Sequence, residues 1–447
     1  MVELSVLVLA QDQPDDLDYL IPVLHDKLRS LNVSYEIIIV DLSICCVVPD
    51  GRGWNPVQVV SLPRKQYGEA LLAGFAASSG AFIVTMDADL SHPPQFIDTI
   101  WHYREKADLV IASRYVAGGS ARMGPVRGFL SRLLNRAYKR LADFPFEDFS
   151  SGFRMYRREV VERFRWKCRS FDLLQEILVR TNAEGGYVVE VPFRYKARVH
   201  RNSFFRLLRF GWAYFSTFIR MWRLRNSVEA ADYDYRAYDS RIPLQRYWQR
   251  ERHHIIMSFL DQDDSILDIG CGSSRIILDL PQAIGLDILD RKIRWLSRRR
   301  SFLVRGSCDR LPFPDNSFDS VICSEVIEHV PDKPEILGEM SRVLRPGGTL
   351  ILGTPDYGRW LWWVLEWIYG LVLPGAYAQE HITHFTRRTL SERLVAAGYQ
   401  ILDCRYVGYC EMIFKATKKT SILRNSGNSF ENLSGDRALP AQYHGWV

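Results

Sequence analysis

The hydrophobic pattern alternates between short apolar runs and longer segments with helical spacing. Apolar runs at 4–10 and 35–41 flank a segment at about 16–30 whose apolar residues recur every three to four positions. Continuous apolar runs of this length are typical of strands buried on both faces of a parallel sheet, and the longer spacing is typical of an amphipathic helix. The pattern therefore predicts strand–helix–strand units, which make an α/β fold.

This alternation continues through the first half of the chain, stops, and then restarts. The first half contains further predicted strands at 57–62, 81–89 and 108–115, and a helix of small residues at 68–80. The second half resumes, after a polar and acidic segment, with predicted strands at 265–272, 283–287, 302–307, 318–326 and 347–355. We therefore predict two α/β domains, 1–226 and 241–418, with a linker at 227–240 and a disordered Ser-, Asn- and Gly-rich tail at 419–447.

Composition places the chain among ordinary globular proteins. Of its 447 residues, 47% are hydrophobic and 25% are charged, and the net charge of +6 is too small to indicate nucleic-acid binding. None of the eight cysteines forms a Cys-x-x-Cys pair, which favours reduced thiols in a cytosolic protein. No basic leader or cleavage signal opens the sequence, and no apolar stretch reaches the length of a membrane span. We expect a cytoplasmic protein.

Two carboxylates one residue apart follow the apolar run at 81–85. Asp87 and Asp89 stand where a parallel strand is predicted to end, and ligands of open α/β sheets bind beyond those ends. Oxygen ligands of this kind suit Mg²⁺ or Mn²⁺, and such a metal would neutralise a diphosphate leaving group. The alternative is a solvated loop in which an aspartate caps a helix.

The segments around this pair resemble a known enzyme family. "DADLSHPPQFI" (87–97), "DLVIASRYVAGGS" (108–120) and "DFSSGFRMYRREV" (148–160) occur in that order. Together, over about 4–210, they resemble the dolichol- or polyprenyl-phosphate sugar transferases, which are inverting family 2 glycosyltransferases of the GT-A fold. The resemblance implies a Rossmann-like fold that binds a nucleotide sugar, a polyprenyl phosphate or related lipid-linked acceptor, and a divalent metal.

The same resemblance assigns roles to individual residues. It implies Asp87 and Asp89 as ligands of the metal and the donor diphosphate, Arg114 and Arg127 as phosphate contacts, Arg198 as the contact to the acceptor phosphate, and Asp148, Ser151, Gly152 and Arg154 as residues that shape the acceptor site. Arginine suits these positions because its planar fork pairs two phosphate oxygens at once. An acceptor phosphate is already an anion, so positioning and charge neutralisation would replace a strong general base.

Several positions depart from the family pattern. The segment after the first strand reads "LAQDQ" (9–13), Leu42 follows Asp41, Ser91 replaces the usual glutamine, and Phe204 stands in a pattern that has lost its glycine and lysine. Asp41 is interpreted either as a contact to the ribose or base of the donor or as a strand-end cap. These departures support an alternative in which the first domain is a non-catalytic module that binds a membrane or a sugar nucleotide.

The segment at 196–225 carries basic and aromatic residues throughout and no acidic residue. Cationic and aromatic side chains on one helix suit the interface of an anionic membrane. The same composition is compatible with a core helix whose arginines reach solvent, or with stacking on single-stranded nucleic acid. Because a polyprenyl acceptor lies in a membrane, the resemblance supports peripheral membrane contact, and we expect no nucleic acid.

The second half carries a glycine turn after its first predicted strand. "SILDIGCGSSR" (265–275) is followed by an acid at the end of the next strand and by "LPFPDNSFDSVICSEVIEHV" (311–330) and "EMSRVLRPGGTLILGTP" (339–355). This order, over about 260–418, resembles the Rossmann-like class I S-adenosylmethionine-dependent methyltransferases, in particular the type 11-like group. The resemblance implies Asp268, Gly270 and Gly272 around the methionine part of the cofactor, Asp287 on its ribose, and Ser324 and Glu325 along the binding site.

This half also departs from its family. Ser274 replaces a third glycine and Ser307 an acid, although Asp309 lies close by. Candidate bases for the methyl acceptor are His329, His381 and His384, each of which has packing as its alternative. The sequence offers no third ligand for a metal at "HITH". A tryptophan-rich insertion at 359–377 is interpreted as a lid, an interfacial helix or core packing.

Together these observations predict a bifunctional transferase that moves a sugar to a polyprenyl phosphate or related acceptor and methylates a sugar or lipid-linked glycan. The site residues expected to act in catalysis are Asp89, Arg114, Asp148, Arg198 and His329, with S-adenosylmethionine and Mg²⁺ or Mn²⁺ as cofactors. The alternative is a methyltransferase whose first domain is inactive. A nucleic-acid-binding methyltransferase is the third possibility, and it rests on the basic segment alone.

Overall fold

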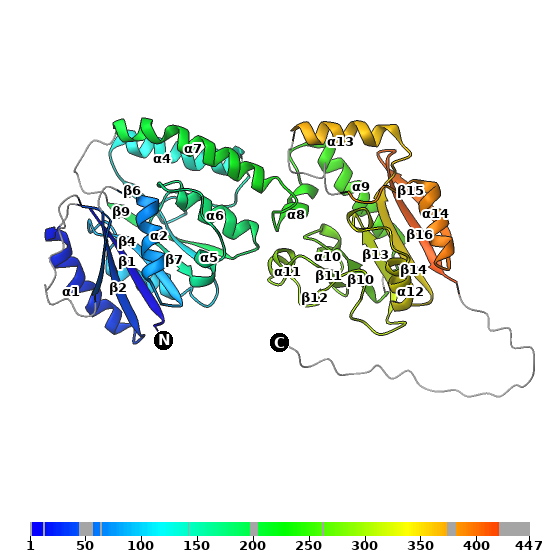
Figure 1. Ribbon diagram of the computed structural model, residues 1–447, viewed down its shortest axis with the longest axis horizontal. Coiled ribbons are helices and arrows are strands. Elements are labelled where there is room, and N and C mark those ends of the chain that lie inside the picture. Colours follow the sequence, from blue (N-terminus) through cyan, green and yellow to red (C-terminus); the bar gives the residue numbers. More distant parts are fainter. Residues whose placement is uncertain are drawn as a thin grey trace, which may run out of the picture.

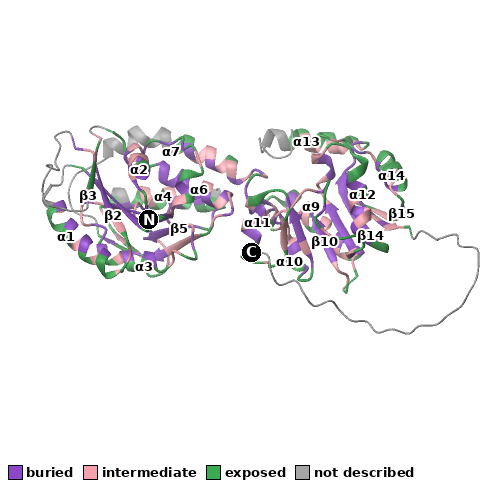
Figure 2. Cartoon of the chain, turned by 60° about the horizontal axis from the view of Figure 1, so that its bottom comes forward, coloured by how far each residue is buried: buried purple, intermediate pink, exposed green. Residues whose placement is uncertain are grey.

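The computed structural model describes residues 2–11, 14–43, 57–62, 65–141, 143–196, 204–261, 263–372 and 381–419. The chain forms two α/β bodies, each built on a seven-stranded sheet (Figure 1). Both sheets are largely buried, and the outer faces of the surrounding helices are exposed (Figure 2). The fold class predicted from the hydrophobic pattern is therefore confirmed.

The first sheet has the order β3-β2-β1-β4-β7-β5-β8. Its strands are β1 (Leu4–Ala10), β2 (Tyr35–Asp41), β3 (Val57–Ser61), β4 (Phe82–Asp87), β5 (Leu109–Ser113), β7 (Arg154–Arg157) and β8 (Val188–Pro192). All pair in parallel except β7, which lies antiparallel between β4 and β5. The sequence pattern did not predict β7, because its four residues are too few to show a period.

Helices cover both faces of this sheet. They are α1 (Pro14–Ser30), α2 (Tyr67–Ala77), η1 (Pro94–Phe96), α3 (Ile97–Trp101), α4 (Pro125–Leu141), α5 (Arg158–Glu162), α6 (Leu173–Ala183) and α7 (Phe204–Arg225). A separate pair of short strands, β6 (Ser120–Arg122) and β9 (Arg194–Lys196), lies beside them.

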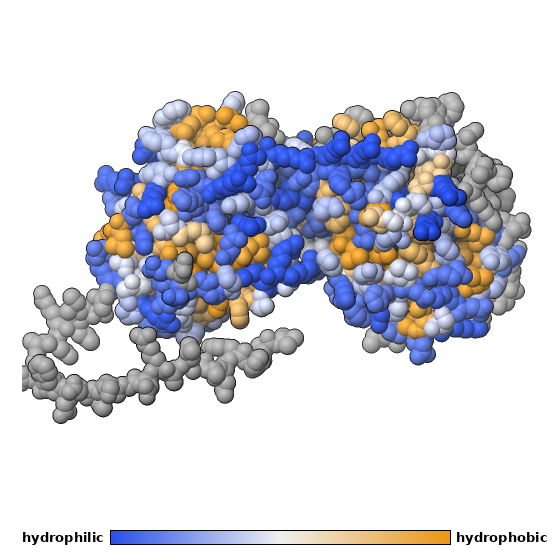
Figure 3. Space-filling view, turned by 180° about the vertical axis from the view of Figure 1, so that it is seen from behind, coloured by the Kyte–Doolittle hydropathy of each residue, from blue (hydrophilic) through white to orange (hydrophobic). Residues whose placement is uncertain are grey.

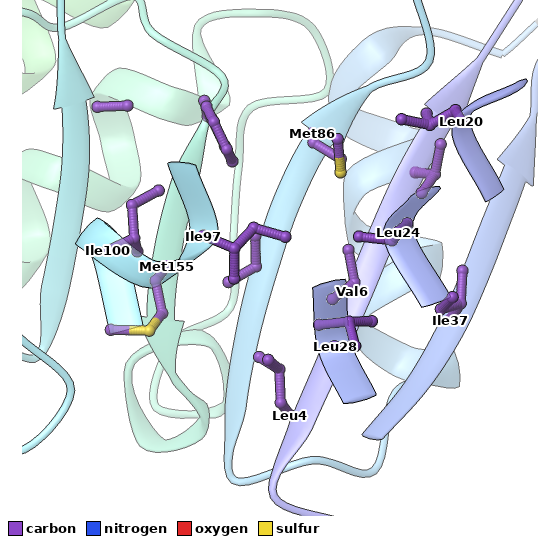
Figure 4. Close-up of a cluster of buried hydrophobic side chains, with 14 of the residues drawn as sticks. Leu4, Val6, Leu20, Leu24, Leu28, Ile37, Met86, Ile97, Ile100 and Met155 are labelled. Carbon is purple, nitrogen blue, oxygen red and sulfur yellow. The ribbon is translucent and has the colours of Figure 1, made fainter. Parts of the chain in front are cut away.

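Each strand supplies both cores because its side chains alternate between the two faces. Leu4 and Val6 pack with Leu20 and Leu24 of α1 on one face (Figure 4), while Leu7 packs on the other face with helices α2 and α6. Burial of each such side chain contributes about 1.5–3 kcal/mol. This two-sided burial explains the continuous apolar runs in the sequence.

The second sheet has the order β12-β11-β10-β13-β14-β16-β15, with β16 antiparallel to both neighbours. The strands are β10 (Ile266–Ile269), β11 (Ile284–Asp287), β12 (Leu303–Arg305), β13 (Phe318–Ser324), β14 (Leu344–Pro355), β15 (Tyr399–Val407) and β16 (Glu411–Lys418). The helices are α9 (Pro243–Phe259), α10 (Arg275–Asp279), α11 (Asp290–Leu296), η2 (Ile327–His329), α12 (Pro334–Val343), α13 (Trp360–Val372) and α14 (Arg387–Ala396). Only the short α10 lies between the glycine turn and Asp287.

The segment between the bodies is folded and contacts both of them. It carries α8 (Tyr233–Tyr238), and the amide of Ala231 donates to the carbonyl of Ala183 at the end of α6. Lys292 of α11 donates to the carbonyl of Ala230 at 3.2 Å. The predicted boundaries at 226 and 241 remain predictions, and residues 420–447 of the predicted tail lie outside the described residues.

Across the described parts of the chain, no helix combines the length and the apolar character needed to cross a bilayer. Six cysteines in these parts are free thiols.

Candidate functional site

The carboxylate pair lies at the end of β4, as predicted. Asp87 is the last residue of this strand, and its side chain is 36% exposed. The amide and hydroxyl of Ser91 both donate to Oδ1 of Asp89, the amide at 3.0 Å, so the residue that replaces the usual glutamine fixes this carboxylate. The amide of Asp87 donates to Nδ1 of His92 at 2.9 Å, and the His92 ring stacks on Phe153. The turn that presents both acids is therefore held at two points.

Next to this turn, Arg114 and Asp148 form a buried ion pair. Arg114 Nε and Nη2 donate to the two carboxylate oxygens of Asp148 at 2.8 and 2.7 Å, and the amides of Ser150 and Ser151 donate to the same carboxylate. Burial opposes ionisation of Asp148, but the hydrogen bonds and charge of Arg114 outweigh it, so the pKa of Asp148 lies below its ordinary value.

This pairing gives Arg114 contacts that the sequence did not reveal. The Arg114 side chain is 8% exposed, and its Nη2 also donates to the hydroxyl of Ser150 at 2.7 Å. Arg114 is thus tied to the loop at 148–152, the predicted acceptor loop, and its role as a phosphate contact stays a prediction. Glu190 of β8, which the sequence did not single out, supports the same loop by accepting from the amides of Glu147 and Asp148 at 2.8 Å each.

Arg154 also acts through the backbone. Its side chain is fully buried, and its guanidinium donates to the carbonyls of Ser151, Leu174 and Phe149 at 2.7, 2.7 and 3.1 Å. Arg154 therefore holds the backbone of the loop at 148–152, and its predicted part in the acceptor site stays a prediction.

Gly152 brings the acceptor loop against the end of β4. Its carbonyl accepts from the hydroxyl of Thr85 at 2.7 Å, and a Cβ at this position would lie 2.5 Å from the hydroxyl oxygen of Tyr67. Burial, followed by the nearby charge of Asp87, raises the pKa of Tyr67. Tyr67 is thus part of the same site, which sequence patterns did not reveal because it lies at the start of α2.

Three other residues were predicted to act in the first body: Asp41, Arg127 and Arg198. Asp41 is fully buried at the end of β2, and its Oδ1 accepts from the amide of Ser43 at 2.9 Å, which is the hydrogen bond of a strand-end cap. Arg127 belongs to α4, but its side chain lies outside the described side chains. Arg198 lies outside the described residues.

In the second body, the glycine turn follows β10 and bends through positive φ angles. Gly270 has φ +66°, and a Cβ there would lie 2.2 Å from a methyl group of Val326. Gly272 has φ +54°, and its amide donates to Oδ2 of Asp287 at 2.8 Å. The other oxygen of Asp287 accepts from the amide of Leu289 at 2.8 Å. These residues form a tight loop whose backbone a ligand can approach closely.

Asp268 stands beneath this loop with a buried carboxyl oxygen that lacks a described hydrogen-bond partner. Its side chain is 3% exposed, and among the described residues Oδ2 has no hydrogen-bond partner. Burial, and after it the neighbouring Asp287, raise the pKa of Asp268 to about 8. A ligand that carries a cationic group, such as the ammonium of S-adenosylmethionine, fits this donor set because it would match the carboxylate.

An acid from the segment between the bodies completes the loop. Asp234 of α8 accepts from the amide and hydroxyl of Ser273 at 3.0 and 3.1 Å and pairs with Lys292 at 2.8 Å. Its burial opposes ionisation, but Lys292 and Ser273 outweigh that effect and lower its pKa. The sequence placed Asp234 in a linker, so nothing in the local pattern connected it with the loop.

Glu325 lies just beyond β13 at φ +58°, and its amide donates to the carbonyl of Gly353. Arg252 of α9 lies 3.2 Å from its Oε2 and also donates to both carboxylate oxygens of Glu411 at 2.6 and 2.7 Å. Burial raises the pKa of Glu325. The hydroxyl of Ser324, at the end of the same strand, is buried with no described partner. Arg252 was missed because α9 shows only an ordinary amphipathic pattern.

The candidate base His329 lies at the same end of this sheet, in η2. Possible ligand atoms of Glu328, His329 and His381 lie within 4.8 Å of one another. His384 stands nearby, with its ring centroid 4.1 Å from that of Tyr357. The structure therefore gathers the three predicted histidines at the carboxyl ends of β13 and β14, where an acceptor would meet the cofactor.

Comparisons with known proteins match the two parts of the chain to two different families. Residues 50–165 match the model of glycosyl transferase family 2, and residues 267–352 match the model of a methyltransferase domain. The chain is 32% identical over 223 residues to the dolichol-phosphate mannosyltransferase of Pyrococcus furiosus, a match that covers 45% of this chain and 59% of that protein. It is 34% identical over 121 residues to a probable S-adenosylmethionine-dependent methyltransferase of Mycolicibacterium smegmatis, which covers 25% of this chain and 47% of that protein.

Among solved structures, the chain is similar to a methyltransferase of Thermotoga maritima described as a possible histamine N-methyltransferase. The identity is 21% and the TM-score 0.36, over 41% of this chain and 95% of that chain. The chain spans less than two thirds of the length of the curated relatives named above. The two family matches confirm the resemblances found in the sequence: a glycosyl transferase family 2 segment precedes a methyltransferase domain in one chain.

Proposed function

We propose that this chain, which combines a glycosyl transferase family 2 segment with a methyltransferase domain, is a bifunctional transferase acting at a membrane surface. The first body would transfer a sugar from a nucleotide sugar to a polyprenyl phosphate or related acceptor. The second would methylate a sugar or lipid-linked glycan with S-adenosylmethionine. The observation that carries the proposal is that each sheet has a built site at the carboxyl ends of its central strands.

In the first site, Asp87 and Asp89 would hold the donor diphosphate through Mg²⁺ or Mn²⁺. A divalent metal bound there would supply neutralisation of the negative charge that develops on the leaving diphosphate. The ion pair of Arg114 and Asp148 ties the acceptor loop to the end of β5, and the hydrogen bond from Thr85 to Gly152 ties it to β4. An acceptor phosphate oxygen would thereby be positioned for displacement at the sugar. Arg127 and Arg198 remain the proposed contacts to phosphate.

In the second site, the loop at 270–274 and Asp268 would hold the methionine part of S-adenosylmethionine, and Asp287 its ribose. The cofactor supplies an electrophilic methyl group when bound. Ser324 and Glu325 would line the reacting edge, and His329 is the proposed base for a hydroxyl acceptor. Arg252 keeps Glu325 and Glu411 in place by contacting both of them.

Exposed aromatic and apolar side chains support contact with a membrane. Helices α4, α7 and α13 lie along one edge of the molecule in Figure 1, and apolar patches appear on the upper edge of both bodies in Figure 3. Trp360 and Trp367 of α13 are 70% and 67% exposed, and Phe129 of α4 and Phe215 of α7 are exposed as well. Tryptophan and phenylalanine on one side of a protein suit the interface of a bilayer, where a polyprenyl acceptor lies.

The test uses the full chain with anionic vesicles that contain polyprenyl phosphate, a panel of labelled nucleotide sugars with Mn²⁺, and S-adenosylmethionine labelled in its methyl group. We expect sugar label in the lipid fraction, lost in Asp89→Asn, and methyl label in the glycolipid, lost in Asp268→Asn. Methyl label on an added glycolipid, without sugar transfer from any donor, would favour the alternative of an inactive first domain. Absence of both labels from folded protein would overturn the proposal.

A further inference from the structure

We propose that the second body binds a divalent transition-metal ion through Glu328, His329 and His381, beside the place of the methyl acceptor. Metal binding itself does not depend on the proposed function, but the role given to the metal below rests on it. The sequence showed two of these residues side by side and the third about fifty positions later, so only the folded chain brings the ligand set together.

The three ligands are held by the backbone. Glu328 and His329 lie in η2, directly after β13, and their possible ligand atoms and that of His381 lie within 4.8 Å of one another. The amides of Ile382 and Thr383 donate to the carbonyl of Glu328 at 2.7 and 3.0 Å. The hydroxyl of Thr383 donates to the carbonyl of Val330 at 2.6 Å. The segment that carries His381 is thus fastened to η2, and small side-chain adjustments would bring the three groups to metal-bonding distance.

Glu328 indicates, independently of the cluster, that a cation can bind here. Its side chain is fully buried, and Oε2 accepts from the hydroxyl of Thr354 at 3.0 Å. Oε1 is also buried, lies 4.0 Å from Nε2 of His329, and has no hydrogen-bond donor among the described residues. A buried carboxylate oxygen without a donor is costly, and a bound cation at this point would remove that cost.

The surroundings of His381 are those of a metal-bound histidine. A histidine that binds a metal through one ring nitrogen usually forms a hydrogen bond to an oriented group through the other. Nδ1 of His381 lies 2.6 Å from the hydroxyl of Tyr357, and Glu366 Oε1 lies 3.4 Å from the same nitrogen. Tyr357 and Glu366 therefore fix the ring orientation.

The ligand set indicates the class of ion. Two imidazoles and one carboxylate suit Zn²⁺, Fe²⁺, Co²⁺ or Mn²⁺ better than Mg²⁺ or Ca²⁺, and three protein ligands leave positions open for substrate. Because the cluster lies at the carboxyl ends of β13 and β14, a hydroxyl oxygen of the acceptor would fill one of them and become more acidic. Methyl transfer then breaks the sulfonium S–CH₃ bond, forms the acceptor O–CH₃ bond, and releases the hydroxyl proton to solvent. With the metal bound, His329 would be a ligand, and this role would replace that of the base proposed above for the site without metal.

The experiment measures metal binding to the full chain without cofactor or acceptor. The parent carries Asp87→Asn and Asp89→Asn, so that the proposed metal site of the first body does not contribute. Protein stripped with chelator is titrated with Co²⁺, followed by its visible absorption, and then with Zn²⁺ in competition. We expect one equivalent to bind, and Glu328→Gln, His329→Ala and His381→Ala each to weaken binding about 100-fold.

His384→Ala is the matched control, because this histidine is close by but outside the cluster, and it should leave the affinity unchanged. Thermal unfolding without metal checks that each variant is folded. His329→Ala should disturb the fold least, since the His329 side chain is 28% exposed.

No Co²⁺ binding by the folded parent, or binding that none of the three variants weakens, would overturn the proposal. Metal binding without methyl transfer to any acceptor would support the metal site and contradict the proposed function. Methyl transfer by a protein that binds no Co²⁺ would support the proposed function and contradict the metal site.

Discussion

Replacement of Asp268 by asparagine should stabilise the cofactor-free protein and abolish its affinity for S-adenosylmethionine. The substitution keeps the size of the side chain and removes a charge that the fold disfavours. Burial and the neighbouring Asp287 raise the pKa of Asp268 from 3.8 to about 8. Each pH unit of that shift corresponds to about 1.4 kcal/mol, so ionising Asp268 in the folded protein costs on the order of 5 kcal/mol.

The direction in which stability changes with pH follows from the raised pKa of Asp268. Because the folded pKa is raised, the contribution of Asp268 to stability is complete below about pH 4 and is lost as the pH rises toward 8. The difference in unfolding free energy between Asp268→Asn and the parent should therefore increase with pH across this range. Urea unfolding of the full chain at a series of pH values measures it, and a linear transition slope shared by both proteins checks that they unfold alike.

Cofactor binding supplies the second half of the test. An ammonium group beside Asp268 would favour its carboxylate, so binding of S-adenosylmethionine to the parent should release a proton and tighten as the pH rises toward 8. Calorimetry in buffers of different ionisation enthalpy detects that proton. Asp319→Asn is the control, because hydrogen bonds from Arg345 and Ser265 outweigh its desolvation and lower its pKa. Its stability difference should stay flat as the pH rises from about 4 to 8, and it should change, with the opposite sign, only at lower pH. A stability difference for Asp268→Asn that stays flat with pH would refute the reasoning.

Three further predictions concern other parts of the molecule. Asp148→Asn leaves the buried charge of Arg114 without its carboxylate and should cost roughly 3 kcal/mol, measured as a lower urea midpoint. Asp234→Ala removes the anchor of the glycine loop and should weaken S-adenosylmethionine binding about tenfold, measured by calorimetry. Trp360→Ser together with Trp367→Ser should reduce binding to anionic vesicles in a sedimentation assay while the far-ultraviolet dichroism stays unchanged.

Each of these three predictions can be contradicted by a specific result. An Asp148→Asn protein as stable as the parent would mean that the ion pair does not hold the acceptor loop. Unchanged cofactor affinity in Asp234→Ala would remove α8 from the second site. Vesicle binding that survives both tryptophan substitutions would place the membrane contact elsewhere, with α4 and α7 as the remaining candidates.

Local pattern was sufficient for much of the architecture. The parallel strands β1, β2 and β4 show continuous apolar runs because both of their faces are covered, and the helix of small residues fits because α2 lies close to the sheet. At Gly74 of that helix, a Cβ would lie 2.9 Å from a methyl group of Leu7. The short strand β7 and the antiparallel β15 and β16 escaped prediction, since their pairing depends on neighbours that are remote in sequence.

Some residues of the candidate sites could likewise be predicted from the sequence, and others could not. Asp87, Asp268 and Gly270 follow predicted strands directly, so position along the chain was enough to find them. Arg252 and Asp234 lie on helices whose local pattern says nothing about a site, and only packing against the sheet brings them there.

By itself, therefore, the sequence determined that there are two α/β units and which strand ends carry chemistry, because strand period and motif order are properties of neighbouring residues. Tertiary structure alone decided which charges meet. It paired Arg114 with the buried carboxylate of Asp148, a contact that the sequence did not reveal. It also placed His381 against Glu328 and His329, since contacts between distant segments depend on how the sheet and its helices pack.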